Sequence, residues 1–390
     1  MLNQDIMRNV ADAYVRQGIF AAVEWYVEVD GKPASSGVRV GEGFPKLPDT
    51  PIYRIYSMTK PIVAFAALRL IEQGRLRLYD PAEKFLPEFA NPRVQNCDGA
   101  SESSRGPILV EHLLTHRAGL SYGFNMGCHV GSLYARDRLM ADTRAPLAEF
   151  AAKVASYPLA FHPGSQWRYS LSIDVLAAIL EISTGQDLPA ILDELVFSPL
   201  GMSDTGFSVP SEQSGRILPI YGEPNLDMLN PISPNPPCFD ELDMSRAHPW
   251  PRDSAAPRGG HGLFSTIPDY ANFARSLIDG NAPSGERLIS TAMLEFMLAN
   301  RIPDSQLPLR IGVLEFPGYG WNLLGRIMLD PGKSLSLTAA GEIGWAGAAS
   351  TFFWVDRSKA MVGLSMTQYL GSAFPLGPDS MAAAYSALDA

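Results

Sequence analysis

Hydrophobic and polar positions predict extended structure near both ends of the chain. Phe20–Val29 is rich in Val, Trp and Tyr, the turn sequence Asp-Gly-Lys-Pro follows, and Gly37–Val40 resumes extended character. Near the other end, Ser350–Val355 and Met361–Thr367 flank a polar turn at residues 356–359. β-Branched and aromatic runs separated by turn residues are typical of β-hairpins. We therefore predict one hairpin at each end.

Helical patterns occupy the first residues and most of the middle of the chain. Met1–Val23 alternates charged and apolar residues as an amphipathic helix does, and Asp379–Leu388 predicts a last helix. The near-continuous apolar run Pro61–Leu68 predicts a helix buried on most sides, which ends at Gly74. Four further helices are predicted in the middle, at Leu109–Thr115, Ala145–Ala155, Ile173–Ser183 and Leu188–Leu195.

Two β-rich ends around a mostly helical middle indicate an α+β fold. We expect one antiparallel β-sheet built from both termini and flanked by helices, formed by residues 1–80 and 260–390. Residues 81–259 would form a mainly helical inserted domain. Within it, residues 210–257 hold ten of the 32 prolines, which disfavours regular structure there. A loop of this length either covers the mouth of a pocket or lies on the surface.

Composition and charge narrow the range of partners. The 390 residues carry 31 Lys+Arg and 41 Asp+Glu, a net charge of −10, without a basic run. This balance disfavours nucleic acids and anionic membranes, and no apolar run approaches the ~20 residues of a membrane span. No secretory signal is evident, so we expect a cytoplasmic location. The three cysteines share no close spacing, which predicts neither a disulfide framework nor a thiolate metal site.

Ser57 and Lys60 are the first candidates for chemistry. They stand three residues apart at the start of the predicted apolar helix, so both side chains can meet at its N-terminal end. A serine hydroxyl becomes a good nucleophile when an adjacent base takes its proton, and burial disfavours the charged ammonium form of a lysine. The Ser57 N–H could also stabilise an oxyanion. The alternative is a capping serine with a solvated lysine one turn later.

Two other segments could complete such a site. Ser170 or Ser172 is expected to cap the following helix, which leaves Tyr169 on a loop from which its hydroxyl could enter a cleft. The small residues of Gly344–Ser350 lead into a strand, where they permit close approach of a ligand and a second N–H donor. The alternatives are an amphipathic core tyrosine and a tight strand packed against a helix.

Together these features resemble the family VIII carboxylesterases, serine esterases of the β-lactamase fold related to class C β-lactamases and DD-peptidases. Six phrases stand in the order of that family and span nearly the whole chain: Tyr56–Pro61, Leu113–Leu120, Pro163–Leu171, Leu200–Phe207, Gly260–Tyr270 and Gly344–Gly347. Six ordered matches are far more specific than one Ser-x-x-Lys tetrapeptide, which arises readily by chance.

The resemblance implies a cofactor-independent enzyme that forms an acyl-enzyme from a small-molecule ester. Ser57 would be the nucleophile, Lys60 its base, and Tyr169 the group that shares the proton transfer and protonates the leaving group. The N–H groups of Ser57 and Ala348 would form the oxyanion hole. The substrate-binding residues would be Trp345, which lines the acyl or alcohol pocket, and Gly347.

Two departures from the β-lactamase pattern bear on the substrate. Leu171 stands where β-lactamases of this fold carry the Asn of Tyr-x-Asn, and Trp345-Ala346-Gly347 replaces Lys-Thr-Gly. In those enzymes the lysine would help to hold a substrate carboxylate. Its absence here favours uncharged apolar esters as substrates, with weak β-lactam hydrolysis as a possible side activity. A β-lactamase or D-Ala-D-Ala peptidase is the second interpretation, and a non-catalytic penicillin-binding or sensing module is the third.

Two other motifs point to different chemistry. Gly119–Gly123 fits the Gly-x-Ser-x-Gly elbow of α/β-hydrolases, but a helical pattern precedes it where that motif needs a strand. His112 and His116 have i, i+4 spacing without the glutamate of a zinc protease, so no metal is predicted. The sequence does not predict an oligomeric state.

Overall fold

The computed structural model describes residues 4–95, 100–125, 127–141, 144–222, 239–244, 256–372 and 374–388. Its main element is a seven-stranded sheet whose described neighbours are all antiparallel. The strand order is β10 (Tyr319–Trp321), β11 (Arg326–Met328), β12 (Ile343–Gly347), β13 (Thr351–Asp356), β14 (Met361–Met366), β1 (Ala22–Val29) and β2 (Lys32–Val40). Strand β1 pairs with β14, so both ends of the chain build one sheet, as predicted.

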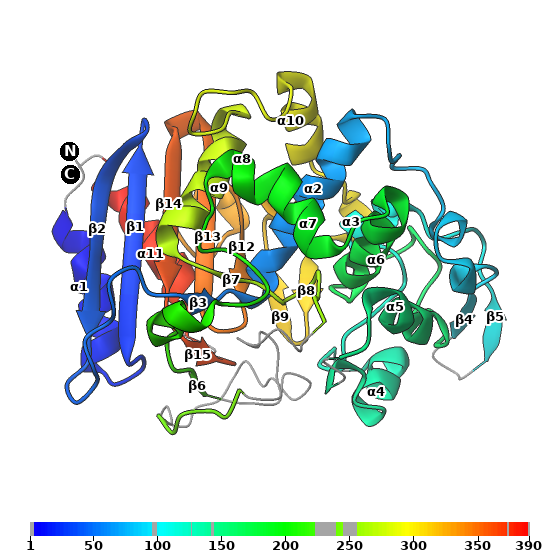
Figure 1. Ribbon diagram of the computed structural model, residues 1–390, viewed down its shortest axis with the longest axis horizontal. Coiled ribbons are helices and arrows are strands. Elements are labelled where there is room, and N and C mark those ends of the chain that lie inside the picture. Colours follow the sequence, from blue (N-terminus) through cyan, green and yellow to red (C-terminus); the bar gives the residue numbers. More distant parts are fainter. Residues whose placement is uncertain are drawn as a thin grey trace.

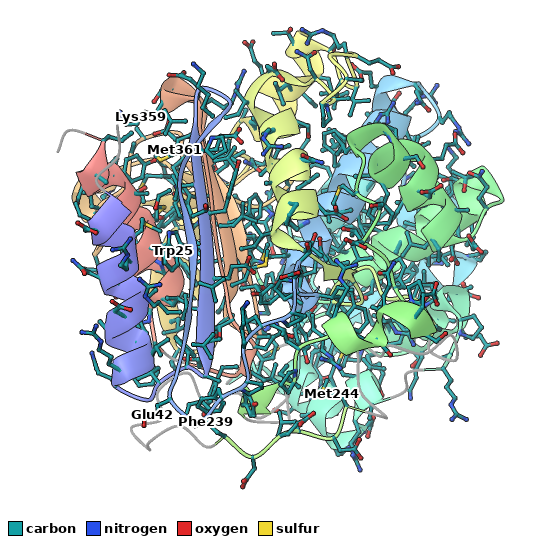
Figure 2. All side chains as sticks on the ribbon, turned by 60° about the vertical axis from the view of Figure 1, so that its left-hand side comes forward. Trp25, Glu42, Phe239, Met244, Lys359 and Met361 are labelled. Carbon is teal, nitrogen blue, oxygen red and sulfur yellow. The ribbon has the colours of Figure 1, made fainter. Side chains whose placement is uncertain are left out.

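Helices cover both faces of this sheet (Figure 2). On one face α1 (Gln4–Arg16) lies against α11 (Leu376–Ala387), and on the other face α9 (Ile267–Asp279) packs on β13 and β14. Side chains alternate between the faces because successive residues of a strand point in opposite directions. In β13, Phe352 and Trp354 join the core under α1 and α11, whereas Phe353 and Val355 join the larger core on the other side.

The larger core continues into a mostly helical region beside the sheet (Figure 1). Helix α2 (Thr59–Glu72) runs through it and is buried along most of its length, as its apolar sequence predicts. The other helices are α3 (Val110–Leu114), α4 (His129–Arg136), α5 (Leu147–Ala155), α6 (Ser172–Thr184), α7 (Leu188–Leu192), α8 (Ser198–Leu200) and α10 (Thr291–Leu298). The α+β fold with helices around an antiparallel sheet is thus confirmed.

Four short ladders complete the described structure. They pair β3 (Tyr53–Arg54) with β7 (Phe264–Ser265), β4 (Arg93–Gln95) with β5 (Ser101–Ser103), β6 (Tyr221–Gly222) with β15 (Tyr369–Leu370), and β8 (Leu309–Ile311) with β9 (Leu314–Phe316). In the part of the chain that is described, no single helix is long and apolar enough to cross a bilayer. Ser172–Thr184 and Leu188–Leu200 meet that criterion only together, bent by 86°.

Several predicted boundaries were wrong. The first helix ends at Arg16, because Gly18 adopts φ +67° and strand β1 already begins at Ala22. The last helix starts at Leu376, three residues earlier than predicted. Strand β2 starts at Lys32, within the predicted turn. The hairpin of β13 and β14 lies where the sequence places it.

The proline-rich segment 210–257 contains more regular structure than predicted. Residues Ser211–Arg216 form a 3₁₀ helix, and β6 pairs in parallel with β15. Leu242 and Met244 pack against Tyr56 and Ala349. The four clustered prolines, Pro231, Pro234, Pro236 and Pro237, lie outside the described residues, and the domain boundaries at 81 and 259 stay a prediction.

Candidate active site

Ser57 lies on a tight turn immediately before α2. Residues Tyr56–Met58 form a 3₁₀ turn, and α2 begins only at Thr59 without a side-chain cap, so the alternative of a capping serine at position 57 is wrong. Tyr56 adopts φ +42°, a conformation that costs a residue other than glycine about 1–3 kcal/mol and recurs at functional sites. The turn leaves Ser57 partly exposed between the buried residues Tyr56 and Met58.

Lys60 is buried directly behind Ser57. Its Nζ lies 3.1 Å from Ser57 Oγ, and Lys60 is only 1% exposed to solvent. Nζ also faces two aromatic rings, 4.8 Å from the ring centre of Tyr169 and 5.3 Å from that of Tyr122. The alternative of a solvated lysine is therefore wrong. The two side chains meet although Ser57 precedes the helix rather than belonging to it.

A buried carboxylate lies on the far side of Lys60. Lys60 Nζ donates to the Gly260 carbonyl at 2.6 Å, and the Gly260 N–H donates to Asp174 Oδ1 at 2.9 Å. Asp174 is fully buried on α6, and this burial raises the pKa of its carboxyl group, while the charge of Lys60 opposes the rise. Sequence reasoning missed Asp174. The available signal was one charged residue within the apolar run of that helix.

Tyr169 lies on the loop before α6, as predicted, but neither Ser170 nor Ser172 caps that helix with its side chain. The two serine hydroxyls hydrogen-bond to each other at 2.8 Å instead. Tyr169 is 5% exposed, and its Oη accepts a hydrogen bond of 3.0 Å from Trp345 Nε1. The phenol of Tyr169 lines the same cavity as Ser57.

The end of β12 approaches the Ser57 turn closely. A Cβ atom at Gly347 would collide with the Ile55 carbonyl and the Thr351 hydroxyl, so only glycine fits there without movement. Among the described residues, neither the Ser57 N–H nor the Ala348 N–H donates to a protein acceptor. Both residues line the cavity, which is what an oxyanion hole needs.

A cavity of about 350 Å³ opens at these residues and extends along β12 beneath the β8–β9 hairpin. Figure 1 shows that hairpin between the sheet and the helical region. Much of the described lining is aromatic or aliphatic, including Phe124, Ile311, Leu314, Phe316, Trp345, Phe374 and Leu376. The lining arginine, Arg326, is paired with Glu342 at 2.8 Å. The cavity therefore suits an uncharged apolar ligand.

Two further residues hold Tyr169: His116, which stands out in the sequence only as part of a possible metal pair, and Asn125, which belongs to none of the motifs. His116 is 1% exposed, lies 4.7 Å from the ring centre of Tyr169, and its Nδ1 lies 3.2 Å from Ser170 Oγ. Burial, and then the charge of Lys60, hold the pKa of His116 well below its usual range, so this imidazole stays neutral. The Asn125 amide donates to the Tyr169 carbonyl at 2.9 Å.

The proposed functional residues of the two other motifs, Ser121 and His112, are not part of the described cavity lining, although Tyr122 and His116 of the same motifs lie at the site. Ser121 of the Gly-x-Ser-x-Gly match is fully buried, follows helix α3 rather than a strand, and is not part of the described cavity lining. Its Oγ accepts a hydrogen bond from the Asn125 amide at 3.2 Å. His112 Nδ1 accepts from the Leu109 N–H at 3.2 Å, which is local hydrogen bonding at the start of α3.

An antiparallel sheet with a serine and a buried lysine at the start of a core helix defines a β-lactamase-type serine hydrolase. The sequence pattern of the Beta-lactamase family matches residues 7–387, and the chain belongs to that family. Esterase EstB of Burkholderia gladioli is 33% identical over 350 residues, which cover 86% of this chain and 82% of EstB. The chain thus fits a family VIII esterase of the serine β-lactamase fold, as its motifs predict.

Solved structures agree with this fold. EstCE1, described as a hydrolase with promiscuous acyltransferase activity, superimposes with a TM-score of 0.78 at 24% identity and covers 98% of both chains. Unliganded simvastatin synthase (LovD) of Aspergillus terreus, as its selenomethionyl derivative, gives a TM-score of 0.76 at 21% identity, again over 98% of both chains. At these identities the similarity establishes the fold.

Proposed function

We propose that this serine hydrolase is a carboxylesterase that cleaves small uncharged esters through an acyl-enzyme on Ser57. The observation that carries the proposal is the contact between Lys60 Nζ and Ser57 Oγ at 3.1 Å, on a lysine removed from solvent. A buried amine at that distance is placed to take the hydroxyl proton as Ser57 attacks an ester carbonyl.

In the proposed mechanism the proton transfers return Lys60 and Tyr169 to their starting protonation states. As the Ser57 oxygen bonds to the ester carbon, its proton passes to Lys60. When the bond from carbon to the leaving oxygen breaks, Tyr169 gives its phenolic proton to that oxygen and recovers one from Lys60. The net movement is one proton from Ser57 to the departing alcohol, and water then releases the acid by the reverse sequence.

Charge on the carbonyl oxygen would be stabilised by the N–H groups of Ser57 and Ala348. Both line the cavity and neither has a partner within the described part of the chain. Donors that are already fixed where negative charge develops are worth more than donors that must reorganise, and one of them is worth about 10²–10³ in kcat. Gly347 would keep β12 close enough to present the second donor.

The lining favours neutral esters. Trp345 stands where β-lactamases of this fold carry a lysine, and the charge of Arg326 is already paired with Glu342. A substrate carboxylate would therefore lose its hydration without gaining an unpaired cation. Apolar acyl or alcohol groups instead remove aromatic and aliphatic surface from water, which is favourable at about 25 cal/mol per Å².

The deciding experiment is the variant Ser57→Ala, assayed with p-nitrophenyl butyrate. We expect turnover to disappear while circular dichroism stays that of the parent protein. Mass spectrometry after a fluorophosphonate probe should place the label on Ser57 in the parent protein and find none in the variant. Undiminished hydrolysis by Ser57→Ala would overturn the assignment.

Two alternatives give different results in the same assays. A β-lactamase or D-Ala-D-Ala peptidase would turn over nitrocefin or a D-Ala-D-Ala peptide with a higher kcat/KM than p-nitrophenyl butyrate. A non-catalytic penicillin-binding or sensing module would label stoichiometrically at Ser57 and hydrolyse no ester. We expect the ester to be the best of these substrates.

A further inference from the structure

We infer that Trp345 is a positioning residue for the proton transfer from Tyr169, beyond its place in the cavity wall. Its indole N–H fixes the orientation of the phenol, so that the proton of Tyr169 points into the cavity toward the leaving oxygen. This inference rests on the proposed esterase mechanism and assigns a new role within it.

The direction of the hydrogen bond between the two side chains is fixed by chemistry. An indole nitrogen is a donor only, so in the 3.0 Å contact between Trp345 Nε1 and Tyr169 Oη the phenol oxygen must accept. Within the described residues this oxygen has no other hydrogen-bond partner. The O–H proton of Tyr169 therefore points away from Trp345, and this orientation allows it to point into the cavity that both residues line.

Both rings are held, so the orientation is maintained. Trp345 packs edge-on against Trp321, with ring centres 4.5 Å apart, and Trp321 Nε1 donates to the Leu114 carbonyl at 3.2 Å. The backbone of Tyr169 is tied by the Asn125 amide at 2.9 Å. A phenol that is fixed at its backbone and at its oxygen has little freedom to turn its proton away from the reacting atoms.

The consequence appears when the bond between the ester carbon and the leaving oxygen breaks. That oxygen takes the electron pair of the bond and the proton of Tyr169, and Lys60 returns to Tyr169 the proton that it received from Ser57. The Trp345 N–H stabilises the phenolate that exists between these two transfers. No atom of Trp345 changes bonding, so it acts through Tyr169.

This role differs from lining the cavity. Phenylalanine would line the same wall and keep much of the contact with Trp321, but it carries no donor. The variant Trp345→Phe therefore removes the hydrogen bond while it retains an aromatic ring. A matched control is Trp167→Phe, because the ring centre of Trp167 lies 6.5 Å from that of Tyr169 and its buried Nε1 has no hydrogen-bond partner among the described residues.

The test is a series of substituted phenyl butyrates, from 4-nitrophenyl to 4-methoxyphenyl, which share one acyl group and nearly one shape. 4-Nitrophenolate leaves readily without a proton, whereas 4-methoxyphenolate needs one. For Trp345→Phe we expect the ratio of kcat/KM for the 4-methoxyphenyl ester to kcat/KM for the 4-nitrophenyl ester to fall about threefold to tenfold, the factor of one neutral hydrogen bond, in addition to any loss that both esters share because the cavity wall has changed. Trp167→Phe should leave the dependence of kcat/KM on the leaving group unchanged.

If Trp345→Phe lowered kcat/KM by the same factor for every ester, Trp345 would only shape the cavity. If it left kcat/KM unchanged for every ester, the hydrogen bond from Trp345 to Tyr169 would not contribute to catalysis. Either result overturns the inference. The proposed function is judged separately, because its test is the activity of Ser57→Ala on the 4-nitrophenyl ester, which does not depend on protonation of the leaving group. Tyr169→Phe should make kcat/KM depend more steeply on the leaving group than Trp345→Phe does. Thermal denaturation of each variant confirms that it is folded.

Discussion

The close approach of β12 to the Ser57 turn makes Gly347→Ala an informative perturbation. The added Cβ would collide with the Ile55 carbonyl on one side and the Thr351 hydroxyl on the other. Ile55 directly precedes the turn that carries Ser57, and Gly347 directly precedes Ala348. Any shift that relieves the collision therefore separates the two N–H groups assigned to the oxyanion hole.

The size of the effect follows from this geometry. Restoring ordinary contact with the Ile55 carbonyl needs a movement of about 1 Å, because carbon and oxygen atoms settle near 3.5 Å. Overpacking of this kind costs about 1–3 kcal/mol of stability, which lowers Tm by a few degrees. A misplacement of about 1 Å at a catalytic centre costs about 10²-fold in rate, and loss of one oxyanion donor costs about 10²–10³-fold.

The assay compares kcat on p-nitrophenyl butyrate with Tm for Gly347→Ala and for the control Gly106→Ala. The control position has no heavy atom within 4 Å of an added Cβ and has no positive φ. We expect kcat to fall about 10²-fold for Gly347→Ala and to be unchanged for the control. A Gly347→Ala protein with lowered Tm but parental kcat would refute the argument that this contact sets the oxyanion site.

Three other predictions address the groups around the site and the pH dependence of stability. Tyr169→Phe should lower kcat/KM for an alkyl ester by about 10²–10⁴-fold, the range for a general acid, as measured by titration of the released acid. Asp174→Asn keeps an acceptor for the Gly260 N–H but removes the negative charge near Lys60. We expect kcat to fall at least about tenfold while the fold is unchanged, and parental activity in this variant would exclude an electrostatic role for Asp174. Burial, with a smaller effect of Arg117, lowers the pKa of His112 to about 4 from its ordinary 6.5. The unfolded chain then binds more protons between these values, so stability falls as pH decreases from about 6.5 to 4, and His112→Gln should reduce that slope in denaturant titrations.

The fold was largely predictable because its signals are local. Val23, Trp25 and Val27 alternate with less buried residues along β1, and that pattern is readable in the sequence. Helix α2 is apolar on nearly every side, which only a buried helix tolerates. The sequence does not predict the end of the first helix at Arg16, because the amphipathic pattern continues past Gly18, whose positive φ ends the helix.

The site was predictable only where its residues are close in sequence or match a family motif. The contact between Ser57 and Lys60 follows from a spacing of three residues. Gly260 lies 200 positions after Lys60, and Asp174 is joined to it only through tertiary packing, so no periodicity could bring them together. The hydrogen bond from Trp345 to Tyr169 spans 176 positions and depends on the orientation of two rings.

Burial alone gives an incomplete account of Lys60 as a base. Taking an ammonium group out of water disfavours it, which is the argument available from an apolar helix. The structure adds groups that act in the opposite direction: the faces of Tyr122 and Tyr169, the Gly260 carbonyl, and the carboxylate of Asp174 behind it. Aromatic faces and carbonyl oxygens stabilise a cation. Such neighbours suit the proposed base, because the proton that Lys60 receives from Ser57 must be held there until Tyr169 takes it up.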